Sequence, residues 1–286
     1  MRIRHSLALA AFTALLLAPL AHADLTLPRP SPGATVVQRV GLTDLTVKYS
    51  RPGVKGRVIW GDLVPWDKPW RTGANEATSL TTTTEIQFGG QKLGPGTYSV
   101  VTVPGHDQWS VILNSEVITW GGKPTYKAEK NVLELKIAPT AAEAQEWLEF
   151  SFENLTPNSA DLVLRWEKLR LSVPIVVDVN TQAMAAIGTA MTGAKADDWG
   201  TPYQAANWSF TNDASTDNGR KWLEKSLAIQ KNYSNLSLLA RWQLKDGKKP
   251  EAIATAKQAI AAGKASKETV DTAPTEKLLA EWSASK

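Results

Sequence analysis

Apolar and polar residues alternate through the first two thirds of the chain. Residues 44–49 read DLTVKY, and the same period of two recurs in residues 131–137 and 146–153. Successive side chains of a β-strand point to opposite faces, so this pattern predicts strands with one buried face. The strands that we expect span residues 35–40, 44–49, 78–88, 97–103, 109–114, 131–137, 146–153, 162–166 and 168–177. Turns rich in glycine and proline separate many of them, and the set predicts an all-β, antiparallel, jelly-roll-like sandwich over residues 24–179.

The pattern changes to a helical period near residue 180. Beyond this point alanine, lysine, leucine and glutamine dominate the sequence. We expect a smaller α-helical tail over residues 180–286. Its helices are expected at residues 181–191, 202–208, 220–231, 236–245, 250–262 and 275–282.

Within this tail, residues 220–262 carry a spacing that resembles the tetratricopeptide repeat. The matching small and apolar positions are Leu236, Leu239, Ala240, Gly247, Ala252, Ala259 and Ile260. Alanines at the contact let two antiparallel helices approach closely, and the glycine permits a tight turn between them. The spacing predicts a tetratricopeptide-like hairpin, and the alternative is an ordinary helical hairpin. Stable arrays need about three repeats, so we expect these helices to pack on the sandwich or on each other.

The first 23 residues have the features of a secretory signal. A basic start at residues 1–5 precedes an apolar run of 14 residues at 7–20, and the small residues Ala21 and Ala23 follow. A membrane-spanning helix needs roughly 17–25 apolar residues, so the run is too short for an anchor. We expect cleavage after Ala23 and a periplasmic or secreted protein that meets the membrane only through the cleaved signal peptide.

Composition removes several classes of chemistry. The chain has no cysteine, which excludes a thiol nucleophile, a thiolate zinc site and an iron–sulfur cluster. His106 is the single histidine outside the expected signal peptide, so a histidine metal cluster is not expected. The formal net charge of +4 includes no long basic run, which argues against a nucleic-acid partner. We therefore expect neither a metal nor a cofactor.

Residues 49–78 are the most unusual segment of the sequence. They read YSRPGVKGRVIWGDLVPWDKPWRTGANEAT and combine five basic side chains with three acids, three tryptophans, three prolines and four glycines. The segment is too irregular for a helix and too rich in turn residues for one long strand. We expect a long crossover between two strands.

Several strings in and beyond this segment resemble a bacterial protein family. They are YSRP at residues 49–52, KGR at 55–57, LVP at 63–65, WRTGANEAT at 70–78, LGPGTY at 93–98 and WSVILN at 109–114. The order of signal peptide, β domain and tetratricopeptide-like tail is similar as well. The chain thus resembles domain of unknown function 2911, an uncharacterised exported family. The resemblance implies an exported location and a fold but no catalytic residues, because no activity or ligand is established for that family.

Two interpretations of residues 49–78 do not involve catalysis. In the first, the segment is architectural: its three arginines pair with its three acids, and its three tryptophans bury apolar area. In the second, the segment binds a ligand, because guanidinium groups grip carboxylate or phosphate and indole faces stack on rings. The candidate binding residues are Arg51, Arg57, Trp70, Arg71, Asn75 and Glu76.

The third interpretation is an enzyme. Glycoside hydrolysis needs two carboxyl groups beside one bond, and Asp62 and Glu76 are the obvious pair. Arg71 near Glu76 would lower the pKa of that carboxyl, which is the wrong direction for a general acid. The leading prediction is therefore a non-enzymatic binding module of the cell envelope, with an anionic or sugar-like molecule or an envelope protein as partner. The alternative is a hydrolase that acts on an envelope glycan or similar polymer through Glu76 and Asp62.

Overall fold

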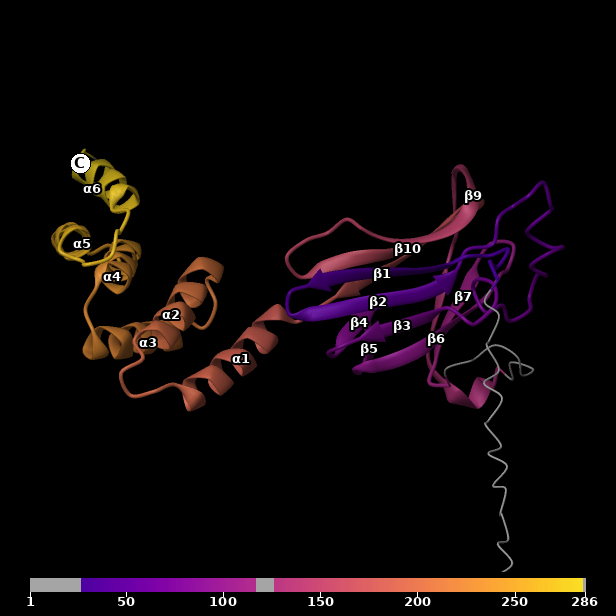
Figure 1. Ribbon diagram of the computed structural model, residues 1–286, viewed down its shortest axis with the longest axis horizontal. Coiled ribbons are helices and arrows are strands. Elements are labelled where there is room, and N and C mark those ends of the chain that lie inside the picture. Colours follow the sequence, from indigo (N-terminus) through magenta and orange to yellow (C-terminus); the bar gives the residue numbers. More distant parts are fainter. Residues whose placement is uncertain (1–26, 117–125, 285–286) are drawn as a thin grey trace, which may run out of the picture.

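The computed structural model describes residues 27–116 and 126–284, so the predicted signal peptide lies outside the described residues. Figure 1 shows a β-rich part followed by helices that lead away from it. The larger sheet contains, in spatial order, β1 (Gly33–Val40), β2 (Thr43–Ser50), β3 (Ser79–Thr82), β6 (Gly96–Val103), β7 (Trp109–Asn114) and β8 (Asn131–Ile137). The smaller contains β5 (Gln91–Leu93), β4 (Ile86–Phe88), β10 (Ser159–Val176) and β9 (Thr140–Glu153). Both sheets are antiparallel, as predicted.

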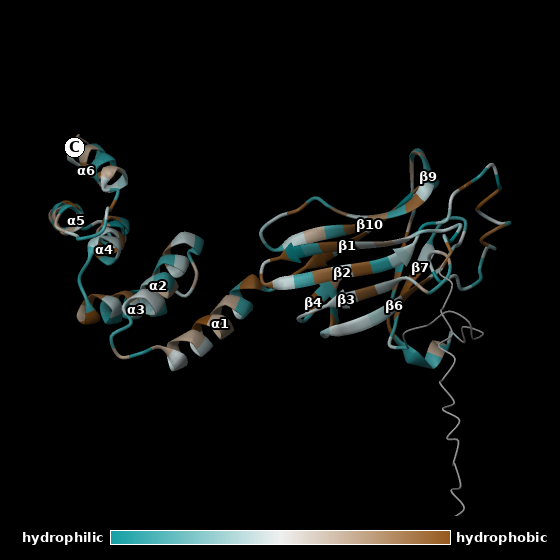
Figure 2. Ribbon diagram, in the orientation of Figure 1, coloured by the Kyte–Doolittle hydropathy of each residue, from teal (hydrophilic) through white to brown (hydrophobic). Residues whose placement is uncertain are grey.

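One hydrophobic core joins the two sheets. Val47 and Leu80 of the larger sheet and Phe88 and Trp166 of the smaller sheet belong to a single buried cluster. Figure 2 shows the alternation that makes this possible, with hydrophobic and hydrophilic positions following one another along β2. A shared core of this kind is what a sandwich of two sheets requires.

The connectivity differs from the jelly roll that we expected. Most neighbours in the larger sheet are consecutive in sequence, and the chain changes sheets only after β3, β5 and β8. Short connections such as residues 41–42 and 104–108 favour hairpins within one sheet over crossings between two. The larger sheet is therefore chiefly a meander.

Two strand boundaries were also predicted wrongly. Residues 78–88 form two strands in different sheets, β3 and β4, because the chain turns between them where Thr82 Oγ1 donates to Thr84 O at 2.8 Å. The two strands expected at residues 162–166 and 168–177 are one strand, β10, which ends at Val176 and whose register with β9 shifts around Glu167. Glu167 has a φ of 56°, so the backbone bends there without ending the strand.

Every helix expected from the sequence is present. The helices are α1 (Val179–Gly193), α2 (Gly200–Asn212), α3 (Thr216–Ile229), α4 (Tyr233–Lys245), α5 (Lys249–Lys264) and α6 (Ala273–Ala284), with a short 3-10 turn, η1 (Ala128–Lys130), before β8. None of the helices in residues 27–116 and 126–284 has both the length and the apolar character that a membrane span requires.

The predicted hairpin is formed by α4 and α5. Ala240, Ala252 and Ala256 are fully buried in one cluster, which lets the two helices approach closely. Gly247 has a φ of 76° in the turn between them, a conformation that favours glycine. The hairpin itself is confirmed, and its tetratricopeptide-like character stays a prediction.

Candidate functional site

The crossover between β2 and β3, residues 51–78, first packs against β9. Arg51 Nε donates to Leu148 O at 2.9 Å, and its Nη2 lies 3.7 Å from Glu149 Oε2. Arg57 Nη2 donates to Gly53 O at 2.5 Å. Arg51 and Arg57, two of the six candidate binding residues, therefore hold backbone in place. Within the described residues, neither of them forms the ion pair with an acid of its own segment that the architectural interpretation expected.

The middle of the crossover contributes Trp60 and Trp70 to a cluster of four tryptophans, and β7 and β10 contribute one each. Trp60 lies edge-on to Trp109 of β7, with ring centroids 4.9 Å apart, and to Trp166 of β10, at 5.6 Å. Trp70 stacks on Trp166 at 5.8 Å, with an interplanar angle of 20°. The cluster thus joins the crossover to both sheets.

The side chain of Trp70 packs in this indole cluster. Its indole N–H donates to Gly73 O at 3.1 Å, and its backbone exchanges two hydrogen bonds with Thr102. The ring is half-buried among other indoles, so it offers little open face for a ligand. The structure accounts for Trp70 by packing, as the architectural interpretation requires.

The end of the crossover, residues 71–78, forms a tight turn beside β2. Thr78 Oγ1 donates to Thr72 O at 2.7 Å, and Asn75 Nδ2 donates to Ser31 O at 2.9 Å and to Ser50 Oγ at 3.2 Å. Arg71 is half-buried, and its Nε has no hydrogen-bond partner among the described residues. The turn fixes the direction of the next side chain, Glu76.

Glu76 pairs with an arginine from outside the crossover. Arg29 Nη1 donates to both carboxylate oxygens of Glu76, at 2.8 and 3.0 Å. The hydrogen bond from Arg29 holds the pKa of the Glu76 carboxyl below its usual range. The carboxylate is therefore ionised at neutral pH and accepts hydrogen bonds.

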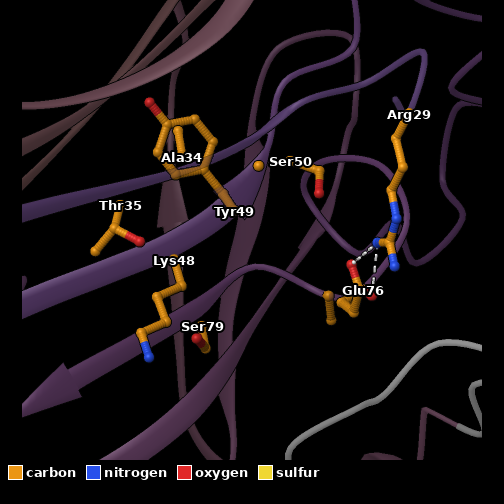
Figure 3. Close-up of a pocket in the computed structure, with 10 residues that line it drawn as sticks. Arg29, Ala34, Thr35, Lys48, Tyr49, Ser50, Glu76 and Ser79 are labelled. Atoms are coloured by element: carbon orange, nitrogen blue, oxygen red, sulfur yellow. Dashed lines mark hydrogen bonds and ion pairs between the residues drawn. The ribbon is translucent and has the colours of Figure 1, made fainter. Parts of the chain in front are cut away.

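A cavity of about 450 Å³ lies beside this ion pair. Figure 3 shows Arg29 and Glu76 joined on one side of it and the side chains of Lys48 and Ser79 on the other. Its walls come from the start of β1, the end of β2, Arg29, Glu76, Ala77 and Ser79. Lys48 forms no ion pair within residues 27–116 and 126–284. The site thus combines a bound arginine, an ionised carboxylate, an unpaired amine and several hydroxyl groups.

Only one of the six predicted binding residues lines this cavity, namely Glu76. Arg51 and Arg57 lie against β9 and the backbone of residues 53–54, and Trp70 lies in the indole cluster. Asp62, the predicted partner of Glu76 in catalysis, is not among the lining residues. The described residues also contain no group of three or more side chains suited to hold a metal ion.

The match to a known protein family ends near the boundary between the β-rich part and the helices. The family model "Protein of unknown function (DUF2911)" matches residues 31–175. The chain belongs to this family. The match covers both sheets of the DUF2911 domain and ends before α1, so the six helices lie outside it. No curated protein and no solved structure matches the chain.

Sequence reasoning missed two charged residues of the DUF2911 cavity. Arg29 lies just before the matched region, between Pro28 and Pro30, which favour an extended chain and do not indicate a site. Lys48 lies on the polar face of residues 44–49, where a lysine is normally a solvated residue. The alternation did locate Lys48 on the outer face of β2, but no signal in the sequence brought Arg29 to Glu76.

Proposed function

We propose that this DUF2911 protein is a non-enzymatic binding module of the cell envelope, and that its ligand is an anionic, sugar-like small molecule. The observation that supports the proposal is the cavity of about 450 Å³ with Arg29, Lys48 and Glu76 around it. Its volume lies within the usual range for small-molecule sites, which is roughly 300–1,000 Å³.

The chemistry of the lining favours a ligand that carries both a negative charge and hydroxyl groups. The amine of Lys48 attracts a carboxylate or phosphate, while the ionised Glu76 accepts hydrogen bonds from ligand hydroxyls. Thr35 and Ser79 donate or accept in either direction. Tyr49 is only 7% exposed, so its ring offers little surface for stacking, and hydrogen bonds carry the recognition.

The hydrolase alternative receives less support. A general acid needs a raised pKa, whereas Arg29 lowers the pKa of Glu76. Asp62 is absent from the lining of the cavity, so the second carboxyl group of the proposed mechanism has no place beside Glu76. We also infer export, on the basis of the signal peptide predicted at residues 1–23.

Titration of the mature chain with glucuronate, glucose 6-phosphate and glucose tests this proposal. We expect isothermal titration calorimetry to detect the two anionic sugars more strongly than glucose. Lys48→Ala and Glu76→Gln should each weaken binding about tenfold, which corresponds to about 1.4 kcal/mol. Lys92→Ala is the matched control, because Lys92 is an exposed strand lysine outside the cavity. Equal affinity in all four proteins, or no binding of either anion, would overturn the proposal.

A further inference from the structure

A second cavity, of about 490 Å³, lies where the helices leave the sheets. One wall is the turn between β1 and β2, which contributes Leu42, and the other walls are α1 and α2. Along α1 the lining includes Ala183, Ile187 and Ala190, and α2 contributes Trp208. This junction groove is separate from the Arg29–Glu76 cavity and shares no residue with it.

The junction groove runs along one face of α1. Its lining follows α1 from Val179 to Ala190, and at 1.5 Å per residue that is about 16 Å. An extended chain of about this length can lie along the groove.

The lining contains no charged residue, and its polar side chains are Thr201 and Gln204. The hydroxyl of Thr201 already donates to Asp198 Oδ2 at 2.6 Å. An extended peptide would need a partner for a backbone N–H and C=O at every residue, and this groove offers far too few. A hydrocarbon chain needs none.

The wall formed by α1 carries no charge. None of its 15 residues is charged, and Ala183, at 8% exposure, is its one buried residue among those described. Ala186 and Ala190 are exposed, although they point into the junction groove. Covering such apolar surface is favourable by about 25 cal/mol for each Å² removed from water.

We propose that the junction groove binds the hydrocarbon chain of a lipid-like molecule, which lies extended along α1 with its polar end in solvent. The site differs in place and in chemistry from the proposed sugar site, so either can exist without the other. Sites at the junction of two parts of a chain, lined mostly by apolar residues with one or two polar groups, are common places for small molecules.

The test uses N-phenyl-1-naphthylamine, an uncharged probe whose fluorescence rises in apolar sites, and dodecanol as its competitor. We expect the mature protein to bind the probe and dodecanol to displace it, whereas butanol at equal concentration does not. Ala190→Phe fills the groove and should weaken probe binding at least tenfold. Ala185→Phe is the matched control, because Ala185 is an exposed alanine of α1 that does not line the groove.

Three outcomes would overturn this proposal. The first is a probe that does not bind, and the second is equal binding by the Ala190→Phe and Ala185→Phe variants. The third is a dimer, detected by light scattering, that Ala190→Phe dissociates, because the groove would then be covered by a second copy of the chain. Circular dichroism of both variants identifies any loss of folding.

Discussion

Arg29 and Glu76 lie 47 positions apart in the chain, and two hydrogen bonds of 2.8 and 3.0 Å join them. The pair connects the segment before β1 to the end of the crossover between β2 and β3. It also forms one side of the cavity proposed to bind an anionic sugar. This ion pair therefore holds the end of the crossover against the segment before β1, and it also forms part of the cavity wall.

Glu76→Gln should lower the free energy of unfolding by about 0.2–1 kcal/mol at pH 7. The side chains of Arg29 and Glu76 are 55% and 44% exposed, so solvent screens much of the attraction. Because the folded protein lowers the pKa of Glu76, the stabilisation is complete above the ordinary glutamate pKa of 4.5. It disappears as the pH falls through the lowered value. Urea unfolding at several pH values should show wild type and variant converging in acid.

The double variant Arg29→Gln, Glu76→Gln separates this pair from other effects. If the two residues stabilise the protein through each other, the free energy of unfolding of the double variant should fall by less than the sum of the two single decreases. High salt should reduce the same coupling, because half-exposed charges are screened. Strictly additive losses at low salt would show that the pair contributes nothing to stability.

Trp109→Ala should lower the free energy of unfolding by about 3–5 kcal/mol, the usual range for a large aromatic side chain removed from a core. Trp109 is 0% exposed and lies 4.9 Å from Trp60, so its loss opens the junction between crossover and sheets. Trp147→Ala is the control that removes the same side chain from the surface, because Trp147 is 37% exposed. Chemical denaturation should rank the two variants clearly, and equal losses would contradict a structural role for the indole cluster.

The strands and helices were largely readable from the sequence, because one face of nearly every strand had to be apolar. The division of residues 78–88 between two sheets was not readable. This segment contains neither glycine nor proline, and its β-branched residues suit a continuous strand. Besides its local hydrogen bond, the turn is held by Thr83, whose hydroxyl accepts from Asp44 N at 2.9 Å across 39 positions. A contact that distant leaves no local signal.

The candidate site was readable only in part for the same reason. Glu76 was recognised from a string rich in charge, but its partner Arg29 lies in a segment without periodicity. Arg51 was expected to pair with an acid of its own segment, yet its Nε donates to Leu148 O, 97 positions away. Local spacing shows which side chains can form ion pairs, and the fold decides which of them meet.

Gly219→Ala should destabilise the helical part by about 1–3 kcal/mol, the usual cost of overpacking. A methyl group at Gly219 of α3 would meet Ser209 of α2 and the ring of Trp242 of α4. Gly188→Ala is the matched change in α1, where nothing lies within 4 Å of the added methyl group. There the change should stabilise the helix by about 0.5–1 kcal/mol, because alanine favours helices more than glycine does. The melting temperature should therefore fall in Gly219→Ala and rise in Gly188→Ala. A shift of the same sign in both variants would contradict this packing.

Gln182→Ala should loosen the attachment of the helices to the sheets without unfolding either part. The amide of Gln182 in α1 donates to Thr43 Oγ1 and to Thr84 Oγ1, both at 2.8 Å, and accepts from Leu42 N at 3.2 Å. Each such bond contributes about 0.5–1.5 kcal/mol net, and α1 buries little else. Hydrogen exchange should therefore quicken in residues 177–186 while β6 and β7 stay protected. Thr189→Ala, an exposed change on the same helix, should leave the exchange of residues 177–186 unaltered, and equal acceleration by both variants would show that α1 is held by other contacts.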